Sequence, residues 1–288
     1  PATTDIYTLS LHDALPIFAK RDDVFVVPIL VILEGKSFRE NLEISKKEII
    51  DYLENSFAKT SLPYPNDVMD AYREMHKRGY DEILVLNLSS GLSGTHNLFI
   101  TMGEQFKSEV GNVQIEYVDS LSLSGGAAML FYKALKMKER GDSLKVIASD
   151  LKKRAGSKNP VFFVIPTVKY LKESGRIGKL EGFVGQILKV KPVVTIDRKG
   201  TFAPVGRARL MKKAVETMVE RLLDAVKGKK IFCVALYHSG DDPETLSLVS
   251  WVREKMKHLS EAFLTGEVSS GILVHGGKGI IGVGALIG

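Results

Sequence analysis

The chain has 288 residues, which is enough for one large or two ordinary domains with a buried pocket. Its composition, 44% hydrophobic and 26% charged, is that of an ordinary soluble protein, and its longest apolar run is too short to cross a bilayer. The net charge of +6 favours a solvated basic surface over a nucleic-acid-binding one, because Lys and Arg are scattered among acidic residues without interleaved aromatics.

The chain begins with a segment that does not match the rest. Pro1 stands where an initiator methionine is usual, and a regular pattern starts only at Phe18. The sequence therefore leaves open whether residues 1–17 are native to the protein. Further along, the single cysteine, Cys233, lies in an apolar run and predicts a buried, inert thiol. With no recognisable secretory signal or membrane span, these features predict a cytoplasmic protein.

Strands and helices alternate in the first half. The expected elements begin with a strand at 24–33, a turn at 34–36, and a helix opened by the capping box Ser45–Glu48 with Ile49, Ile50, Leu53 and Phe57 on one face. An irregular loop at 59–65, a helix at 66–77, a strand at 83–86, a polar turn at 87–95 and a helix at 96–106 follow. The last are a strand at 114–118, a Gly-Gly turn at 125–126 that leads into a helix to about residue 140, and a helix capped at 142–143. This alternation predicts a parallel sheet covered on both faces.

The turn at 87–95 reads Asn-Leu-Ser-Ser-Gly-Leu-Ser-Gly-Thr and separates a strand from a helix. Glycines let backbone N–H groups converge there, hydroxyls add donors, and the following helix presents its positive end, so the turn is suited to hold an anion. The plainer interpretation, that the hydroxyls only cap the helix, fits the same residues.

The polar segment at 152–159 predicts a boundary between two domains, residues 1–155 and 156–288. The expected elements of the second half are a strand at 161–165, a strand at 192–196 with a turn at 198–200, a helix at 209–226, a strand at 231–236, a helix started by Asp242 and Pro243, and two β-like runs within 271–288 separated by residues 275–279. We expect an α/β first domain with a parallel sheet and an α+β second domain.

Common enzyme signatures are missing. Gly35-Lys36-Ser37 resembles the end of a phosphate-binding loop, but Leu30 occupies the position of its required first glycine. The chain has no Gly-x-Ser-x-Gly elbow and no His-Glu-x-x-His, and its six histidines are dispersed. We therefore expect no metal, no cofactor and no catalysis by the chain itself.

Several ordered motifs resemble those of the DegV family of bacterial fatty-acid-binding proteins. They are Thr60-Ser61, residues 88–95, residues 118–120, residues 170–177, Lys191-Pro192, Arg207-Ala208-Arg209 with residues 212–214, and His275 with the glycines that follow it. The resemblance covers the chain from about Phe18 to its end. It implies a two-domain DegV-like fold that holds one long-chain fatty acid between the domains, with the acyl tail buried.

The resemblance also implies roles for individual residues. Ser61 and Ser93 would bind the carboxylate directly, assisted by Thr60 and the backbone of Gly94. We expect this head group at the inner end of the pocket, where an unpaired carboxylate would be costly. Arg176, Arg209 and His275 would support the head group or face a partner, namely the ATP-binding subunit of a fatty acid kinase that makes an acyl phosphate. Contact with a membrane would be at most transient.

Two departures from the family pattern stand out. Residues 10–15, Ser-Leu-His-Asp-Ala-Leu, match the usual Asp-Ser-x-x-Asp-Leu turn only in part, which puts the first strand in doubt. Gly277-Lys278-Gly279 stands where Gly-Pro-Gly is common, which predicts a looser or more basic loop beside His275.

Other interpretations stay open for these residues. Ser93 could be the nucleophile of an esterase or thioesterase, although no histidine lies in a recognisable partner motif. Arg176 could end a helix and form a structural ion pair, and His275 could simply satisfy nearby carbonyls. The last alternatives are a solvated helix face for Arg209 with Lys212-Lys213, and a turn cap for Asp119-Ser120.

Overall fold

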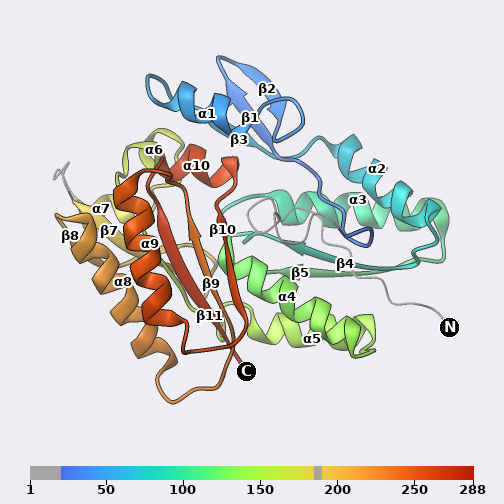
Figure 1. Cartoon of the computed structure of the whole chain (residues 1–288). Coiled ribbons are helices and arrows are strands. Elements are labelled where there is room, and N and C mark those ends of the chain that lie inside the picture. Colours follow the sequence, from blue (N-terminus) through green and yellow to red (C-terminus); the bar gives the residue numbers. More distant parts are fainter. Residues whose placement is uncertain (1–20, 185–189) are drawn as a thin grey trace.

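The computed structural model describes residues 21–184 and 190–288 (Figure 1). Their strands form three sheets. The first holds β1 (Leu30–Leu33), β2 (Lys36–Arg39) and β3 (Lys59–Ser61), and the second holds β4 (Glu82–Asn87) and β5 (Gln114–Asp119). The third, in the order β10-β9-β11-β6-β7-β8, holds β6 (Val161–Val164), β7 (Lys191–Ile196), β8 (Phe202–Ala208), β9 (Ile231–His238), β10 (Phe263–Glu267) and β11 (Ile281–Ile287).

The first sheet is antiparallel and differs from the expected elements in two places. Of the expected strand 24–33, only the last four residues form a strand within the described part of the chain, and this strand is β1. The expected loop at 59–65 was wrong for its first three residues, which form β3 against β1. The prolines at 63 and 65 lie beyond the strand and do not interrupt it.

The helix that follows β2, α1 (Lys46–Leu53), begins as predicted. Ser45 accepts a hydrogen bond from the backbone N–H of Glu48, whose side chain accepts one in return from the N–H of Ser45. The helix ends before Phe57, so the prediction that Phe57 lies on its buried face was wrong, and this side chain is 38% exposed.

The parallel pair β4–β5 is covered on both faces, as predicted. Ile83 and Val85 face α2 (Pro65–Lys77) and α3 (Thr95–Val110) in one core, whereas Leu84 and Leu86 face the opposite core. That second core contains α4 (Gly125–Glu139) and α5 (Leu144–Arg154). The continuous apolar run of β4 is therefore a consequence of burial from both sides.

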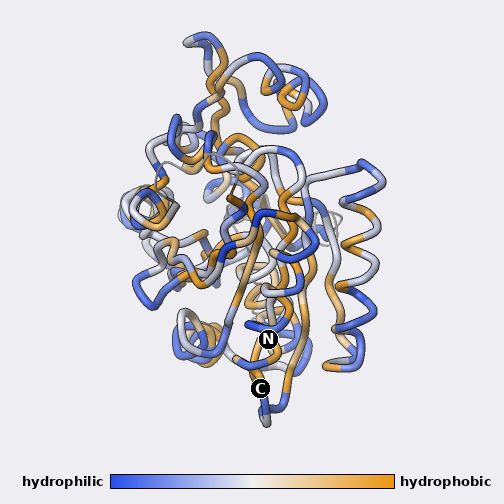
Figure 2. The backbone as a smooth tube through the Cα atoms, turned by 90° about the vertical axis from the view of Figure 1, so that its left-hand side faces the viewer, coloured by the Kyte–Doolittle hydropathy of each residue, from blue (hydrophilic) through white to orange (hydrophobic). Residues whose placement is uncertain are grey.

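The six-stranded sheet is mixed, which confirms the α+β character expected of the second half. β9 and β10 are parallel, and the other neighbours are antiparallel. Two helices, α8 (Met211–Val226) and α9 (Pro243–Met256), share a core with one face, and α4 packs against β9 and β11 in the core that reaches β4. In Figure 2 the inner strands are mostly hydrophobic and the outer helices alternate between hydrophobic and hydrophilic residues.

Helix α4 thus packs against both the six-stranded sheet and the β4–β5 pair, while the division of the chain after residue 155 stays a prediction. Asp242 accepts a hydrogen bond from the N–H of Thr245, and Pro243 is the first residue of α9, as expected.

The single cysteine is buried, as predicted. Cys233 is fully buried, and this burial raises the pKa of its thiol to about 12.

The last expected element was partly wrong. The first of the two β-like runs is the short helix α10 (Ser270–Gly276), and only the second is a strand, β11. His275 therefore lies in the last turn of a helix and not in a glycine-rich loop. The two remaining helices are α6 (Lys169–Glu173) and α7 (Leu180–Val184). In the parts of the chain that the structure describes, no helix is long and apolar enough to span a membrane.

Candidate functional site

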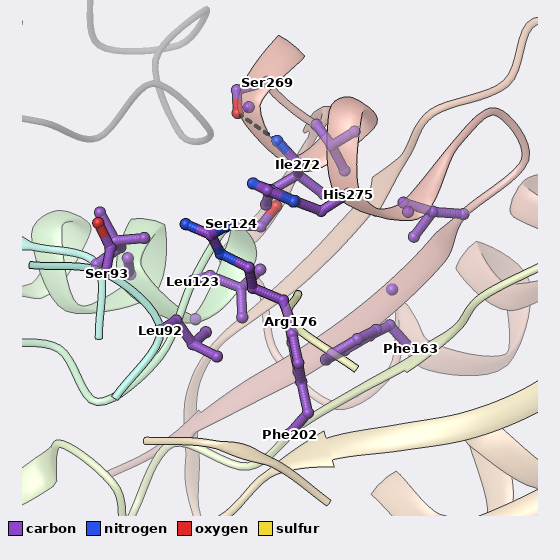
Figure 3. Close-up of a pocket in the computed structure, with 18 of the residues that line it drawn as sticks. Leu92, Ser93, Leu123, Ser124, Phe163, Arg176, Phe202, Ser269, Ile272 and His275 are labelled. Carbon is purple, nitrogen blue, oxygen red and sulfur yellow. Dashed lines mark hydrogen bonds between the residues drawn. The ribbon is translucent and has the colours of Figure 1, made fainter. Parts of the chain in front are cut away.

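A cavity of about 540 Å³ lies where the sheets meet, and Figure 3 shows its lining. Its walls come from β3, the β4–α3 turn, the start of α4, the six-stranded sheet, α6 and α10. Most of the lining is apolar: Ile29, Leu62, Leu88, Leu92, Leu123, Ala127, Val161, Phe162, Phe163, Ile165, Leu171, Phe202, Ala235, Val268, Ile272, Ile280 and Val283. None of the described residues that line it is acidic.

Part of the polar lining lies toward solvent, and we call this end of the cavity the mouth. Ser61, Gly94 and Arg176 are exposed, whereas Val161 and Ile165, which line the same cavity, are buried. Ser61 therefore does not lie at the inner end, where we expected the head group. A ligand that fills this space would have its polar end near solvent and its apolar part enclosed.

Within the turn at 87–95, residues that face the cavity alternate with residues that hold the fold together. Leu88, Ser90, Leu92, Ser93 and Gly94 line the cavity. Ser89 is fully buried and donates a hydrogen bond to the carbonyl oxygen of Gly200, 2.8 Å away in the β7–β8 turn. A Cβ atom on Gly91 would lie 2.6 Å from the carbonyl oxygen of Lys199 in that same turn. Ser89 and Gly91 thus join this segment to the six-stranded sheet.

Ser93 stands at the start of α3. Its hydroxyl lies 2.9 Å from that of Thr95 and accepts from the Thr95 N–H. Gly94, the N-cap residue, supplies no side chain to the first turn of the helix. The positive end of α3 and the Ser93 hydroxyl consequently face the same space, which suits an anionic oxygen.

The opposite side of the mouth is formed by β3 and α10. The Thr60 hydroxyl lies 2.7 Å from Nε2 of His275. Burial, and to a smaller extent the charge of Arg176, lowers the pKa of His275 to about 4. His275 is therefore neutral at pH 7 and can either donate to or accept from Thr60.

Arg176 follows the end of α6, and its guanidinium lies between Ser93 and His275 in Figure 3. It donates to the carbonyl oxygen of Ser174, 2.5 Å away, and within the described residues it forms no ion pair with a carboxylate. The structural ion pair considered for Arg176 is thus not formed there. Its positive charge is available to an anion in the cavity.

The remaining predicted residues do not meet at the cavity. Arg209 is exposed between β8 and α8 and is not part of the lining, and Lys213 pairs with Glu216 on the exposed face of α8. Asp119 accepts hydrogen bonds from the backbone N–H groups of Ser90 and Leu121, so this carboxylate is a turn cap. Lys278, in the loop after α10, forms an ion pair with Asp241, which lies just before α9. Residues 10–15 lie outside the described residues.

Besides Ser90 of the turn at 87–95, two hydroxyls of the lining were not among the predicted site residues. Ser124 precedes α4 with φ 46° and ψ −127°, a backbone conformation that is strained for a residue with a side chain. Ser269 caps α10 by accepting from the N–H of Ile272. In the sequence, the pair Gly125-Gly126 after a strand indicated a turn next to Ser124. Nothing indicated Ser269, because residues 271–274 resemble a strand.

Comparison with known proteins places these observations in a family. A family model described as "Uncharacterised protein, DegV family" matches residues 3–287. The structure is similar to that of a DegV family protein from Thermus thermophilus solved for its fatty acid binding, with a TM-score of 0.85, 31% identity and 98% of each chain covered.

Two further proteins are similar to this chain. A fatty acid-binding protein from Thermotoga maritima is 28% identical over 270 residues, which cover 91% of this chain and 90% of that protein. The fatty acid kinase B3 protein of Streptococcus pneumoniae, solved with linoleic acid, has a TM-score of 0.83, with 98% of this chain and 99% of that chain covered. Because it is only 19% identical, this last match is evidence of a shared fold alone.

Proposed function

Because the chain belongs to the DegV family, we propose that it binds one long-chain fatty acid in the cavity and presents the carboxylate to a fatty acid kinase. The observation that carries this proposal is the division of the cavity into an enclosed apolar part and a mouth with hydroxyls, a helix N-terminus and a guanidinium, without acidic residues among its described lining. This arrangement matches a ligand with one long apolar tail and one anionic end.

The tail supplies the affinity. Burying about fourteen methylenes at about 0.8 kcal/mol each gives on the order of 11 kcal/mol, which offsets the entropy lost on association. The cavity walls contain branched aliphatic side chains and an edge-to-face pair of aromatic rings, Phe163 and Phe202, whose centroids are 5.7 Å apart. These surfaces offer dispersion contacts along the chain and no polar group that a methylene would leave unpaired.

The head group is held at the mouth. We assign direct contacts with the carboxylate to Ser61 and Ser93, with Thr60 and the Gly94 backbone assisting and Arg176 and His275 as support. Hydroxyl and N–H donors can bind the carboxylate without fixing it in a buried ion pair. Because the mouth is exposed, a carboxylate there is within reach of a second protein.

The transfer of a phosphoryl group is assigned to the kinase and not to this chain. The carboxylate oxygen would attack the γ-phosphorus of ATP, giving an acyl phosphate and ADP, while Arg176 balances the developing negative charge. Arg209, exposed on the outer surface, is assigned to contact with the kinase. The fold shared with the S. pneumoniae kinase B3 protein supports this partner.

The competing function, a serine esterase, has little support from the geometry around Ser93. Among the described hydrogen bonds, Ser93 contacts Thr95 and no histidine. His275 contacts Thr60, and Nδ1 of His96 lies 3.1 Å from Oδ1 of Asn87. A nucleophilic serine needs a base within hydrogen-bonding distance, which these contacts do not provide.

Native mass spectrometry of the protein purified from bacteria, followed by lipid extraction, tests the proposal. We expect an added mass of one C14–C18 fatty acid, lost in the double variant Ser61→Ala/Ser93→Ala. The matched control is Ser108→Ala/Ser157→Ala, because both hydroxyls are exposed and donate only to carbonyl oxygens of their own helix or its end. A parent protein that stays free of lipid after incubation with several fatty acids would refute fatty acid binding. Labelling of Ser93 by a fluorophosphonate would favour the esterase.

A pair of arginine variants separates the two cationic roles. Arg176→Gln should weaken fatty acid binding several-fold, because it removes a charge that faces the cavity. Arg209→Gln should leave fatty acid affinity unchanged and lower the rate of acyl phosphate formation with a purified kinase subunit and ATP. Equal loss of fatty acid affinity in both variants would contradict the assignment of Arg209 to the outer surface.

A further inference from the structure

A buried carboxylate at the end of β2 lies outside the site described so far. Glu40 is 1% exposed, follows Arg39 directly, and is held by a backbone hydrogen bond from its N–H to the carbonyl oxygen of Ile29. Burial of a carboxylate is unfavourable unless it accepts strong hydrogen bonds. Its position therefore calls for a specific partner.

That partner is the first turn of α10, which lies 230 residues away in the sequence. Oε1 of Glu40 accepts from the N–H groups of Ser270, at 2.6 Å, and Gly271, at 3.3 Å. Both N–H groups are among those that a helix cannot satisfy internally, and the positive end of the helix dipole strengthens their bond to a carboxylate. Glu40 thus compensates its own burial and fixes the start of α10.

Helix α10 forms part of the cavity wall. Ile272, His275 and Gly276 line the cavity from this helix, together with Gly271 in its first turn. The helix has only seven residues, so its own hydrogen bonds define its position weakly. Contacts with other segments must then decide where His275 lies.

Those contacts come mainly from the small antiparallel sheet and α1. Leu273 and Val274 pack in one core with Val31, Ile49 and Leu53. A Cβ atom on Gly271 would lie 2.5 Å from Cδ1 of Ile29, so the first turn of α10 lies against the side chain that comes just before β1. The same small sheet carries Thr60, whose hydroxyl contacts His275 at the other end of α10.

We propose that Glu40 is a positioning residue for the mouth of the cavity, acting through α10 on the pair formed by Thr60 and His275. The inference rests on the proposed function, because the mouth is where the carboxylate of the fatty acid is assigned. Glu40 holds the N-terminus of α10 against the sheet that bears Thr60. Thr60 and His275 therefore keep a fixed separation, and the Thr60 hydroxyl is directed toward the ligand.

The test compares Glu40→Ala and Glu40→Gln with a control cap. Glu40→Ala removes both hydrogen bonds to α10 and should weaken fatty acid binding about tenfold. Glu40→Gln keeps a neutral oxygen acceptor, so the loss should be about threefold. Asp242→Ala removes a carboxylate cap from α9, which is not part of the described lining, and should leave fatty acid affinity unchanged.

A spectroscopic readout distinguishes positioning from general stabilisation. The Cε1–H resonance of His275, assigned by its loss in His275→Gln, is followed against pH in the delipidated protein. Displacement of α10 in Glu40→Ala should hydrate the ring and raise the pKa of His275 from about 4 toward its ordinary value, whereas Asp242→Ala should not change it.

Unchanged affinity and an unchanged His275 titration in Glu40→Ala would overturn the positioning role. If this variant does not fold, the same unchanged pair of results in Glu40→Gln would overturn it. A parent protein that binds no fatty acid refutes the proposed function instead, and the His275 titration still decides whether Glu40 positions α10.

Discussion

Two segments meet at the mouth of the cavity, and they are held in place in different ways. Ser93 and Gly94 lie between β4 and α3, where a strand buried on both faces leads directly into a helix of 16 residues. α10, which carries His275, has seven residues and is fixed at both ends by side chains of residues 40–60. The first segment brings most of its support with it, and the second depends on partners distant in the sequence.

The two sides of the mouth therefore have separate sources of rigidity. The strand and helix on either side of Ser93 are each anchored in a large core. α10 is anchored by a small core that it shares with α1 and the antiparallel sheet. We therefore expect changes in the small sheet to displace His275 and leave Ser93 in place.

Gly200 is where the segment around Ser93 does depend on a remote contact. The residue has φ +73°, and a Cβ atom there would lie 1.9 Å from Oγ of the buried Ser89. Gly200→Ala should lower the free energy of unfolding by about 3 kcal/mol, because strain and a steric clash add. Urea denaturation at 25 °C measures this loss.

The matched control is Gly228→Ala. Gly228 has φ +71°, but a Cβ atom there would meet no other atom within 4 Å, so only the conformational cost of about 1 kcal/mol is expected. Equal losses of unfolding free energy in the two variants would mean that the Ser89 side chain moves aside at little cost. The segment around Ser93 would then be independent of the β7–β8 turn.

His275 provides a prediction for the other side of the mouth. The pKa of His275 is lowered by burial to about 4 in the folded protein and has its ordinary value near 6.5 in the unfolded chain. As the pH falls from 6.5 to 4, the unfolded chain takes up a proton that the folded protein does not, so stability is lost over this window. Between about pH 7 and pH 4.5 this group alone should cost about 2 kcal/mol.

The measurement is the free energy of unfolding of the delipidated parent and of His275→Gln at both pH values. The variant should lose about 2 kcal/mol less than the parent, while His96, whose pKa is also lowered by burial, contributes equally to both. Identical pH dependence in the two proteins would show that α10 leaves His275 in water.

The same contrast explains how far the sequence predicts this molecule. The strand at 83–86, the turn after it and the following helix follow from a buried apolar run and a glycine-rich start, which are local patterns. Residues 270–276 read Ser-Gly-Ile-Leu-Val-His-Gly, whose branched residues favour a strand. They form a helix because Ser269 and Glu40 satisfy its first N–H groups, and the second of these partners is invisible to local pattern.

The lining of the site shows the same limit. Motif resemblance indicated Thr60, Ser61, Ser93, Gly94, Arg176 and His275, and the structure brings these six to one cavity, while their individual roles stay predictions. Arg209 comes from the same resemblance but lies outside the lining, because β8 ends before it and directs the chain to the surface. Ser89 lies in the same turn as Ser93 but donates to the carbonyl oxygen of Gly200, and sequence spacing does not reveal which hydroxyl a remote turn will occupy.

The two serines of the motif therefore give the sharpest separation of ligand binding from folding. Ser93→Ala should weaken fatty acid binding about tenfold with little change in stability, because its hydroxyl lines the cavity. Ser89→Ala leaves the buried carbonyl oxygen of Gly200 without this donor and should lower the free energy of unfolding by about 1 to 2 kcal/mol, with fatty acid affinity unchanged. Isothermal titration with a C16 fatty acid and urea denaturation measure the two quantities. If Ser89→Ala weakened binding as much as Ser93→Ala, the segment would behave as one unit, and its support would be no more local than that of α10.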